Sequence, residues 1–350
     1  MVEKLGDAWV KKENYVGNGA YKLANHIINE KIEFERNPLY WNDKETVINS
    51  ATFLAIENPS TDVARYRAGD LDITSYALPP EQFAKLQKEL PGEVFTTRTL
   101  ATYSYELNNK KAPFDNVNVR KALNLSLDRN VITDKVLGQG QTPTYVFTPT
   151  YIEEGQLIQQ PAYSKEPMAQ RNEEAIKLLE EAGYSKANPL KFSILYNTNE
   201  NHKKVAIAAA SMWKANTKGL IDVKLENQEW KTYIDSRRAG RYDAARAGWN
   251  ADYNQATTFG NYFLSNSSNN TAKYANPEYD KAIAESYVAT DAEGRAKAYA
   301  KAEEILAKDF GIVPIFNYVN PRLVKPYVKG YSGKDPQDHI YLRNLYIIKH

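Results

Sequence analysis

Three consecutive segments decide the fold: LKFSILY at residues 190–196, KKVAIAAASMWKAN at 203–216 and IDVKLE at 221–226. The first alternates apolar and polar residues with a period of two, and the third has the same character, which predicts two strands. The middle segment favours a helix. A strand, a helix and a strand in this order are typical of an α/β domain.

The same alternation continues on both sides of these segments. Upstream, NEEAIKLLEEA at 172–182 begins with Asn and is followed by Gly183, which predicts an amphipathic helix with both caps. Downstream, the pattern predicts a short helix at 233–240, a strand at 242–249, two helices within 278–308 and a strand at 313–318. We therefore expect an α/β region with a mixed sheet.

The first hundred residues differ from this region and predict a smaller α+β region. Strands are expected at 20–25, 31–36, 50–56 and 94–100, helices at 60–68 and 80–88, and a further strand at 101–109. Residues 319–350 are again strand-like and interrupted by Pro and Gly. The chain therefore leaves the first region, builds a second and returns to the first at its end. It crosses between the two regions twice, near residues 100 and 319. Paired crossings are typical of proteins that close around a hinge.

The composition is that of a soluble globular protein, with 42% apolar and 25% charged residues and a mean hydropathy of −0.61. The net charge is +2, and positively and negatively charged residues alternate along the chain, so we expect no nucleic-acid partner. The first residues lack the pattern of a signal peptide. Taken alone this predicts a cytoplasmic chain, although a mature or truncated chain would look the same.

Catalytic signatures are missing from the sequence. There is no cysteine, which excludes disulfides, thiolate nucleophiles and cysteine zinc sites. The four histidines, at positions 26, 202, 339 and 350, are too scattered for a metal motif. No nucleophile elbow, P-loop or complete dinucleotide fingerprint is present. We therefore expect a protein that is not an enzyme and that needs neither metal nor cofactor.

One segment, ARAGWNADYN at 245–254, suggests a binding site. It begins as a strand and ends in a polar turn. Arg246 can bind a carboxylate through two hydrogen bonds, and Asp252 can pair with an ammonium group. Gly248 lets another backbone approach closely. Such a strand could hold an extended peptide at both charged ends. The alternative is an ordinary ion pair at a strand end.

From Val16 to His350 the chain resembles the periplasmic oligopeptide-binding proteins of bacterial ABC importers, in the peptide/nickel-type solute-binding family. The motifs that carry the resemblance are GNGAYKL (17–23), ERNPLYW (35–41), RYRAGDLDI (65–73), APFD (112–115), VRKAL (119–123), LDR (127–129), LENQEWKT (225–232), the 245–254 segment, RLVKP (322–326) and YIIKH (346–350). Each motif alone is weak, but together and in order they span nearly the whole chain.

The resemblance implies an α/β, two-lobed, type II periplasmic-binding-protein-like fold with mixed sheets, flanking helices and a hinge of two crossings. Residues 1–100 would form a partial lobe I, residues 101–319 an α/β ligand-binding lobe that corresponds to lobe III of the family, and residues 320–350 the return segment to lobe I. The implied function is a monomeric periplasmic receptor. It would capture peptides of about two to five residues with low side-chain selectivity. Its other partners would be the membrane permease subunits of an importer.

The resemblance also implies the residues that bind the peptide. Asp252 would pair with the α-amino group, whereas Arg246 and His202 would serve the carboxylate at different peptide lengths. Tyr318 would bond to the ligand main chain. Hydrated side-chain pockets would be lined by Trp230, Trp249, Glu106, Arg237 and Arg238. The backbone of the strand would pair with the peptide at Gly248, Asn250 and Ala251.

The chain departs from the family at several points. Leu137 stands where a lysine is expected in the loop after the LDR helix, and Arg238 stands where a histidine is usual. Family members are longer upstream, so we expect a C-terminal piece with lower stability and weaker affinity, or a fragment that does not bind. A receptor of the same fold for murein tripeptide, glutathione, haem or nickel is the main alternative. The Asp252 and Arg246 pair favours a zwitterionic ligand.

Overall fold

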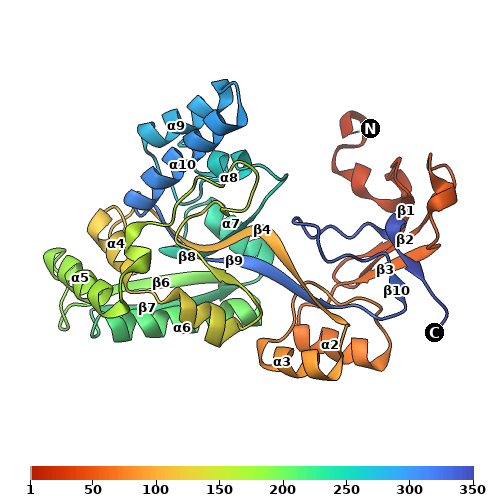
Figure 1. Ribbon diagram of the computed structural model, residues 1–350, viewed down its shortest axis with the longest axis horizontal. Helices are drawn as coiled ribbons and strands as arrows, with labels where there is room; N and C mark the ends of the chain where they lie inside the picture. Colours follow the sequence, from red (N-terminus) through yellow and green to blue (C-terminus); the bar gives the residue numbers. More distant parts are fainter. Residues whose placement is uncertain (1) are drawn as a thin grey trace. The chain divides into compact units, whose positions relative to one another are not determined.

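The computed structural model describes residues 2–350, which divide into two compact units (Figure 1). Unit 2 comprises Arg98–Val319, and unit 1 comprises the chain before it, up to Thr97, together with Asn320–His350. The chain passes from unit 1 to unit 2 within strand β4 (Val94–Leu107) and returns within strand β9 (Ile312–Leu323). None of the helices formed by residues 2–350 is long and apolar enough to cross a membrane.

Unit 2 is built around a six-stranded mixed sheet in the order β5-β9-β4-β8-β6-β7. Its other strands are β5 (Thr142–Pro143), β6 (Leu190–Asn197), β7 (Ile221–Gln228) and β8 (Ala244–Asn250). Strand β6 runs parallel to β7 and β8, whereas β4 runs antiparallel to β8 and β5 antiparallel to β9. The expected α/β fold with a mixed sheet is therefore confirmed.

Helices cover both faces of this sheet (Figure 1). They are α4 (Val117–Leu125), a π-helix (Val131–Leu137), α5 (Met168–Glu181), α6 (Glu200–Asn216), α7 (Trp230–Arg238), α8 (Thr257–Gly260), α9 (Pro277–Val288) and α10 (Ala292–Lys308). On one face, Tyr105 of β4 packs near Trp213 of α6, whose indole donates to the Leu123 carbonyl. On the other face, Phe147 packs against Phe259 of α8. These two aromatic cores hold the sheet in place.

Asparagine caps fix where several of these helices begin. The Asn199 side chain accepts hydrogen bonds from the first turn of α6, and Asn276 does the same for α9. Helix α5 is different because it begins at Met168, directly after Pro167, and has no side-chain cap. The expectation that Asn172 starts this helix is therefore wrong. The helix begins four residues upstream of Asn172.

Unit 1 combines a small antiparallel sheet with two helices. The sheet has the order β1-β2-β3, with β1 at Tyr21–Ile27, β2 at Lys31–Arg36 and β3 at Ser50–Leu54. The helices are α2 (Pro59–Ala68) and α3 (Pro80–Glu89), and short elements lie at α1 (Val2–Leu5), β10 (Val328–Lys329) and β11 (Tyr346–Ile347). Tyr66, Leu78 and Leu86 form its main buried cluster.

Two further stretches differ from the sequence prediction. Residues 94–109 were expected to form two successive strands, but residues 94–107 form the single long strand β4. Residues 319–350, expected to be strand-like, contain the end of β9 and only the two-residue strands β10 and β11. Gly330 and Gly333 adopt positive φ angles in this tail and interrupt extended pairing.

Candidate functional site

Strand β8 carries the central residues predicted from the sequence, and it divides the predicted set between two faces of the sheet. Tyr105 of β4 lies opposite Arg246 in the antiparallel register. Because side chains alternate along a strand, Arg246 and Gly248 face one side. Trp249 and Glu106 face the other side. The predicted residues therefore form two groups rather than one.

Arg246 lies partly buried on the first face and has only neutral partners. Its guanidinium donates to the Tyr318 hydroxyl and, at 3.4 Å, to Asn197 Oδ1. Its Cζ lies 5.1 Å from the centre of the Tyr103 ring, and its Nε has no hydrogen-bond partner. No carboxylate in residues 2–350 forms an ion pair with Arg246. Because an arginine stays charged in proteins, this group can accept an anion.

Gly248 keeps the space beside this charge open. It follows Arg246 by two positions and so lies on the same face of β8. A Cβ atom at this position would lie 3.0 Å from both Arg246 Nη2 and the Tyr318 hydroxyl. The glycine therefore allows Arg246 and Tyr318 to meet over the strand.

His202 lies in the first turn of α6, near Arg246. Its backbone N–H donates to the Asn199 cap, and its ring lies 5.6 Å from the Tyr103 ring. Burial, and then the positive charge of Arg246, lower the pKa of His202 well below its usual range. His202 is therefore neutral at pH 7 and can serve an anion only by donating a hydrogen bond.

The far end of β8 has an unpaired edge. Its pairing with β6 consists of two positions, Ala244 opposite Ile194 and Ala245 opposite Leu195. Beyond Ala245, the ladder between β8 and β6 ends, whereas the ladder between β8 and β4 continues to Asn250. Apart from the Arg246 carbonyl, which accepts a hydrogen bond from the Tyr233 hydroxyl, the backbone of residues 246–250 forms no ladder on this side and could pair with an added strand.

Asp252 lies in the turn after β8 and is exposed. Its N–H donates to Thr258 Oγ1 at 3.1 Å, and that hydroxyl lies 3.3 Å from Asp252 Oδ2. The Trp249 indole donates to the same hydroxyl at 3.2 Å, and its ring packs on Tyr262 at 4.8 Å. Thr258 of α8 therefore holds the aspartate and the tryptophan together.

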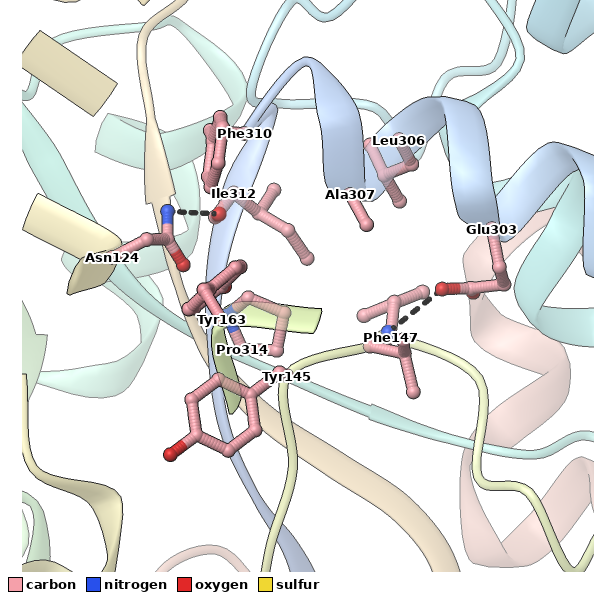
Figure 2. Close-up of a pocket in the computed structure, with 11 residues that line it drawn as sticks. Asn124, Tyr145, Phe147, Tyr163, Glu303, Leu306, Ala307, Phe310, Ile312 and Pro314 are labelled. Carbon is pink, nitrogen blue, oxygen red and sulfur yellow. Dashed lines mark hydrogen bonds between the residues drawn. The ribbon is translucent and has the colours of Figure 1, made fainter. Parts of the chain in front are cut away.

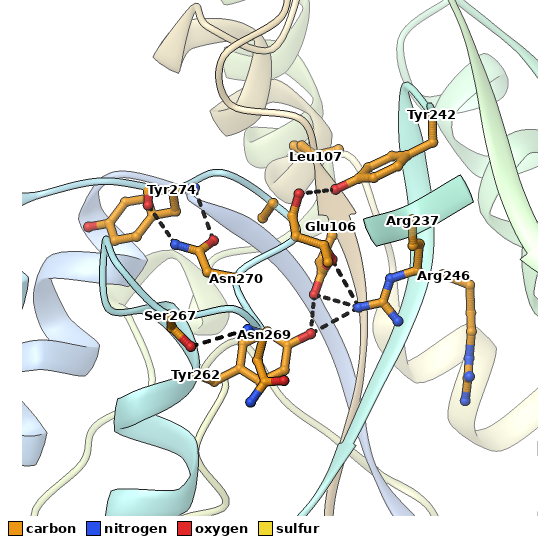
Figure 3. Close-up of polar contacts among 12 residues, drawn as sticks. Glu106, Leu107, Arg237, Tyr242, Arg246, Tyr262, Ser267, Asn269, Asn270 and Tyr274 are labelled. Carbon is orange, nitrogen blue, oxygen red and sulfur yellow. Dashed lines mark hydrogen bonds and ion pairs between the residues drawn. The ribbon is translucent and has the colours of Figure 1, made fainter. Parts of the chain in front are cut away.

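Glu106 and Arg237 form a buried ion pair on the second face (Figure 3). The exposed fractions of their side chains are 1% and 11%, and the Arg237 Nη2 to Glu106 Oε1 distance is 3.1 Å. Tyr262 also donates to Oε1, at 2.6 Å, and Thr271 donates to Oε2. Figure 3 shows Arg246 pointing away from this network. The charges of the two side chains thus neutralise each other, although Arg237 Nε has no hydrogen-bond partner among the described residues.

The remaining predicted residues lie at the ends of α7 and β8. Trp230 begins α7, is 54% exposed and stacks on Tyr233, which donates a hydrogen bond to the Arg246 carbonyl. Arg238 ends the same helix and is exposed. Asn250 is exposed at the end of β8, and the buried Ala251 donates its N–H to the Leu100 carbonyl.

Leu137, expected in a loop, is instead the last residue of the π-helix and is buried in the main core of unit 2. The apolar Leu137 side chain packs in this core. A lysine at the same position would have to extend its ammonium group out of the core to reach water. The structure thus gives Leu137 a packing role.

Sequence reasoning missed several residues that shape these groups. Tyr103, Thr258 and Asn197 contact predicted residues across strands and helices, and no local motif marks them. The alternation of Tyr103 and Tyr105 in β4 was the only available signal, because it places two aromatic residues on one face.

The small cavity in Figure 2 lies away from β8. It has a volume of about 10 Å³, which is room for roughly one water. Glu303 lines it and accepts hydrogen bonds from the N–H groups of Phe147 and Thr148. Burial raises the pKa of Glu303. No cluster of three metal-binding side chains exists among residues 2–350. This cavity is too small for a peptide.

Residues 1–271 match the family described as bacterial extracellular solute-binding proteins, family 5 Middle. The chain belongs to this family. The resemblance found in the sequence is thereby confirmed at the level of the family.

Named relatives and solved structures extend this finding. The chain is 96% identical over 350 residues to the periplasmic oligopeptide-binding protein OppA of Haemophilus influenzae and 44% identical over 345 residues to the periplasmic murein peptide-binding protein MppA of Escherichia coli. It spans 65% and 64% of their lengths and 100% and 99% of its own. The crystal structure of H. influenzae OppA in complex with RPPGFSPFR matches with a TM-score of 0.96 over 99% of this chain and 68% of that one.

Proposed function

We propose that this chain is the peptide-binding portion of a periplasmic oligopeptide receptor that serves an ABC importer. The observation that carries the proposal is the Arg246 charge, which has no counter-ion in residues 2–350 and lies on strand β8, just before the turn that carries Asp252. A zwitterionic ligand has one group for each of these two side chains. The 96% identity to a protein named for oligopeptide binding supports the same conclusion.

The geometry suggests how an extended peptide is held. Its carboxylate is bound by the Arg246 guanidinium, helped by the neutral His202 ring and the Tyr318 hydroxyl. Its main chain adds as a strand to the unpaired edge of residues 246–250. Its ammonium group pairs with Asp252 in the turn. Main-chain contacts of this kind do not depend on the peptide's side chains, so selectivity is low.

The second group supplies the side-chain pockets of the proposed receptor. The charges of Glu106 and Arg237 neutralise each other, so a pocket beside this pair favours neither positively nor negatively charged peptide side chains. Trp230 and Trp249 supply flat surfaces, and Arg238 an exposed positive charge. Water fills the space that a given side chain leaves, which tolerates many sequences.

We further propose that the two strands that cross between the units, β4 and β9, act as a hinge, with unit 1 as part of lobe I and unit 2 as the ligand-binding lobe. The receptor is monomeric and hands its ligand to membrane permease subunits. The relative of 96% identity was crystallised with a nine-residue peptide. The proposed ligand range therefore extends beyond the two to five residues expected from the sequence, to about nine.

The direct test is calorimetry or native mass spectrometry of the purified chain with defined peptides. The panel contains trialanine, a pentapeptide, RPPGFSPFR, murein tripeptide and glutathione. Trialanine is also used with an acetylated amino end or an amidated carboxyl end. We expect retention of unmodified peptides and weaker binding of both modified forms. Retention of glutathione or murein tripeptide alone would favour the alternative receptor, and no retention of any peptide would refute the proposal.

Arg246→Met tests the carboxylate role, with Arg241→Met as the matched control because Arg241 is exposed beside the same strand. We expect the first variant to lose about 2–5 kcal/mol of binding free energy for trialanine, the range for removing one partner of a buried charge pair. It should bind the amidated peptide as the parent does. Equal loss for both peptides would show that Arg246 acts only through the fold.

A further inference from the structure

Two arginines lie buried in unit 2 without an ion pair. Arg129 and Arg171 are 0% and 2% exposed, and both guanidiniums lie near the Tyr145 ring, with their Cζ atoms 4.0 Å and 5.7 Å from its centre. Neither arginine takes part in an ion pair within residues 2–350. Burial lowers the pKa of Arg129, and the charge of Arg171 acts in the same direction. The region therefore holds positive charge that no ion pair neutralises.

The two guanidiniums differ in how well they are hydrogen-bonded. Arg129 donates from all three of its nitrogens, to backbone carbonyls and to the Asn124 side-chain oxygen. Arg171 donates from Nη1 to the Tyr145 hydroxyl at 3.3 Å and from Nη2 to the Met168 sulfur, while its Nε has no partner. A thioether sulfur is a weak acceptor, and a buried charge without strong partners is costly. Arg171 is thus the group that gains from a stronger acceptor.

The weak acceptor is part of the same helix as the arginine. Met168 is the first residue of α5, and Arg171 lies three positions further along, so the two side chains share a face of the helix. The helix has no side-chain cap. The Tyr145 hydroxyl, which points away from Glu303 in Figure 2, joins Arg171 to the loop after β5. The start of α5 is therefore held to this loop through the Arg171 guanidinium.

We propose that Met168 is a modification site, at which an oxidant of the peroxide class converts the thioether to a sulfoxide that binds Arg171. One peroxide oxygen bonds to Sδ as the O–O bond breaks, the sulfur loses two electrons, and hydrogen peroxide is reduced to water. The new oxygen is a strong acceptor on the atom that already faces Nη2. A buried cation thereby gains a charge-assisted hydrogen bond. Oxidation at this position stabilises the start of α5.

Met212 provides a comparison within the same unit. Like Met168 it is partly buried, but it lies on α6 and packs against the main apolar core of unit 2. The sulfur of Met212 accepts no hydrogen bond within residues 2–350. A sulfoxide there places a polar oxygen against apolar side chains, which is unfavourable. The same chemical change should therefore stabilise the chain at Met168 and destabilise it at Met212.

The first test replaces Met168 by residues that imitate the two oxidation states. Met168→Gln carries its side-chain oxygen on the atom that corresponds to the sulfur, as the sulfoxide does, and Met168→Leu is the apolar control. We expect the Gln variant to melt about 2–4 °C above the Leu variant. Leu is at least as good a helix former as Gln, so helix propensity does not favour this order. In an Arg171→Leu background the difference should disappear. A Gln variant that melts at or below the Leu variant would overturn the proposal.

The second test oxidises the 350-residue chain with hydrogen peroxide and locates the added oxygen by peptide mapping. In Met212→Leu only Met168 of the two can react, and in Met168→Leu only Met212. We expect oxidation to raise the melting temperature of the first variant by about 2–4 °C and to lower that of the second. A Met168 that stays reduced while Met212 is oxidised, or a Met168 sulfoxide that lowers the melting temperature, would refute the proposal. Neither test measures peptide binding, so a chain that binds no peptide counts against the proposed function alone.

Discussion

At the scale of single residues, Arg246 and Gly248 depend on each other. The guanidinium reaches Tyr318 across a position where any side chain would crowd both groups at 3.0 Å. Gly248 does not have a positive φ angle, so the backbone can accept alanine. Its role is space rather than backbone freedom. The site thus depends on the absence of one methyl group.

Gly248→Ala should therefore weaken peptide binding without loss of fold. The new Cβ displaces the Arg246 guanidinium from Tyr318, and we expect affinity for trialanine to fall by about tenfold, or 1.4 kcal/mol. The change is measured by calorimetry beside a thermal melt, which should match the parent. The amidated peptide serves as control because it lacks the carboxylate. This role would be contradicted if the variant melted at a lower temperature than the parent and if the ratio of its affinities for trialanine and for amidated trialanine equalled the parent's.

His202 predicts a pH dependence of stability. Burial, and then Arg246, lower its pKa in the folded state below the ordinary value of 6.5, and the Tyr103 ring faces it. Below pH 6.5 the unfolded chain binds a proton at this position that the folded chain does not. Stability is therefore full above pH 6.5 and falls as the pH drops, by at most about 1.4 kcal/mol per pH unit.

Thermal melts at pH 7.5 and 5.0 measure this effect. His202→Gln should show a smaller decrease in melting temperature than the parent, and His339→Gln, at an exposed position, should show the same decrease as the parent. Glu303, whose pKa is raised by burial, contributes a slope of opposite sign from pH 4.5 upward. That slope is common to all three proteins and cancels. Parallel profiles for the parent and His202→Gln would rule out the assignment.

At the scale of elements, two loops are joined beside the candidate ammonium site. The buried Glu154 accepts from Gln255 at 2.8 Å and from Arg295 of α10 at 2.7 Å. Its neighbour Glu153 joins the turn after β8 through backbone groups, which bind Asn254 and Ala256. Glu154 is held at a φ of 65°, a conformation that non-glycine residues seldom adopt. The loop before α5 therefore fixes the turn that carries the candidate aspartate.

Glu154→Gln tests this coupling. Loss of the charge frees Arg295 and loosens the turn, so we expect affinity for trialanine to fall several-fold. Affinity for the acetylated peptide should stay unchanged, because that peptide has no ammonium group to pair with the turn. Glu153→Gln is the matched control, since the Glu153 side chain is exposed and its contacts use backbone. Equal weakening of both peptides would mean that Glu154 serves only stability.

The elements themselves follow from local sequence to different degrees. Periodicity predicts β6, α6 and β7 because each buries a regular face, as Phe192, Val205 and Ile221 do. It fails in the tail after residue 323, where isolated apolar residues pack without a repeating pattern. The Arg246 and Asp252 segment could be predicted because both residues lie on one strand and turn. The pairing of Glu106 with Arg237 could not, because 131 positions separate the two residues.

At the scale of the whole molecule, the two units differ in how much core they contain. Unit 2 has two large buried clusters, which centre on Trp213 and on Phe259. Unit 1 has small clusters around Tyr66 and Val324, and its sheet has no buried residue. Because burial of apolar surface is the main stabilising contribution, unit 1 should be the less stable part.

Hydrogen exchange of the isolated chain tests this difference. We expect the amides of β1, β2 and β3 to exchange at least a hundredfold faster than those of β6 and β8, whose neighbours cover both faces of the sheet. Thermal unfolding should then proceed in two steps, with unit 1 first. A bound peptide should slow exchange in unit 2. Uniform protection with a single unfolding transition would contradict this prediction. It would mean that β4 and β9, the two strands that cross between the units, couple the units into one folding unit of a single stability.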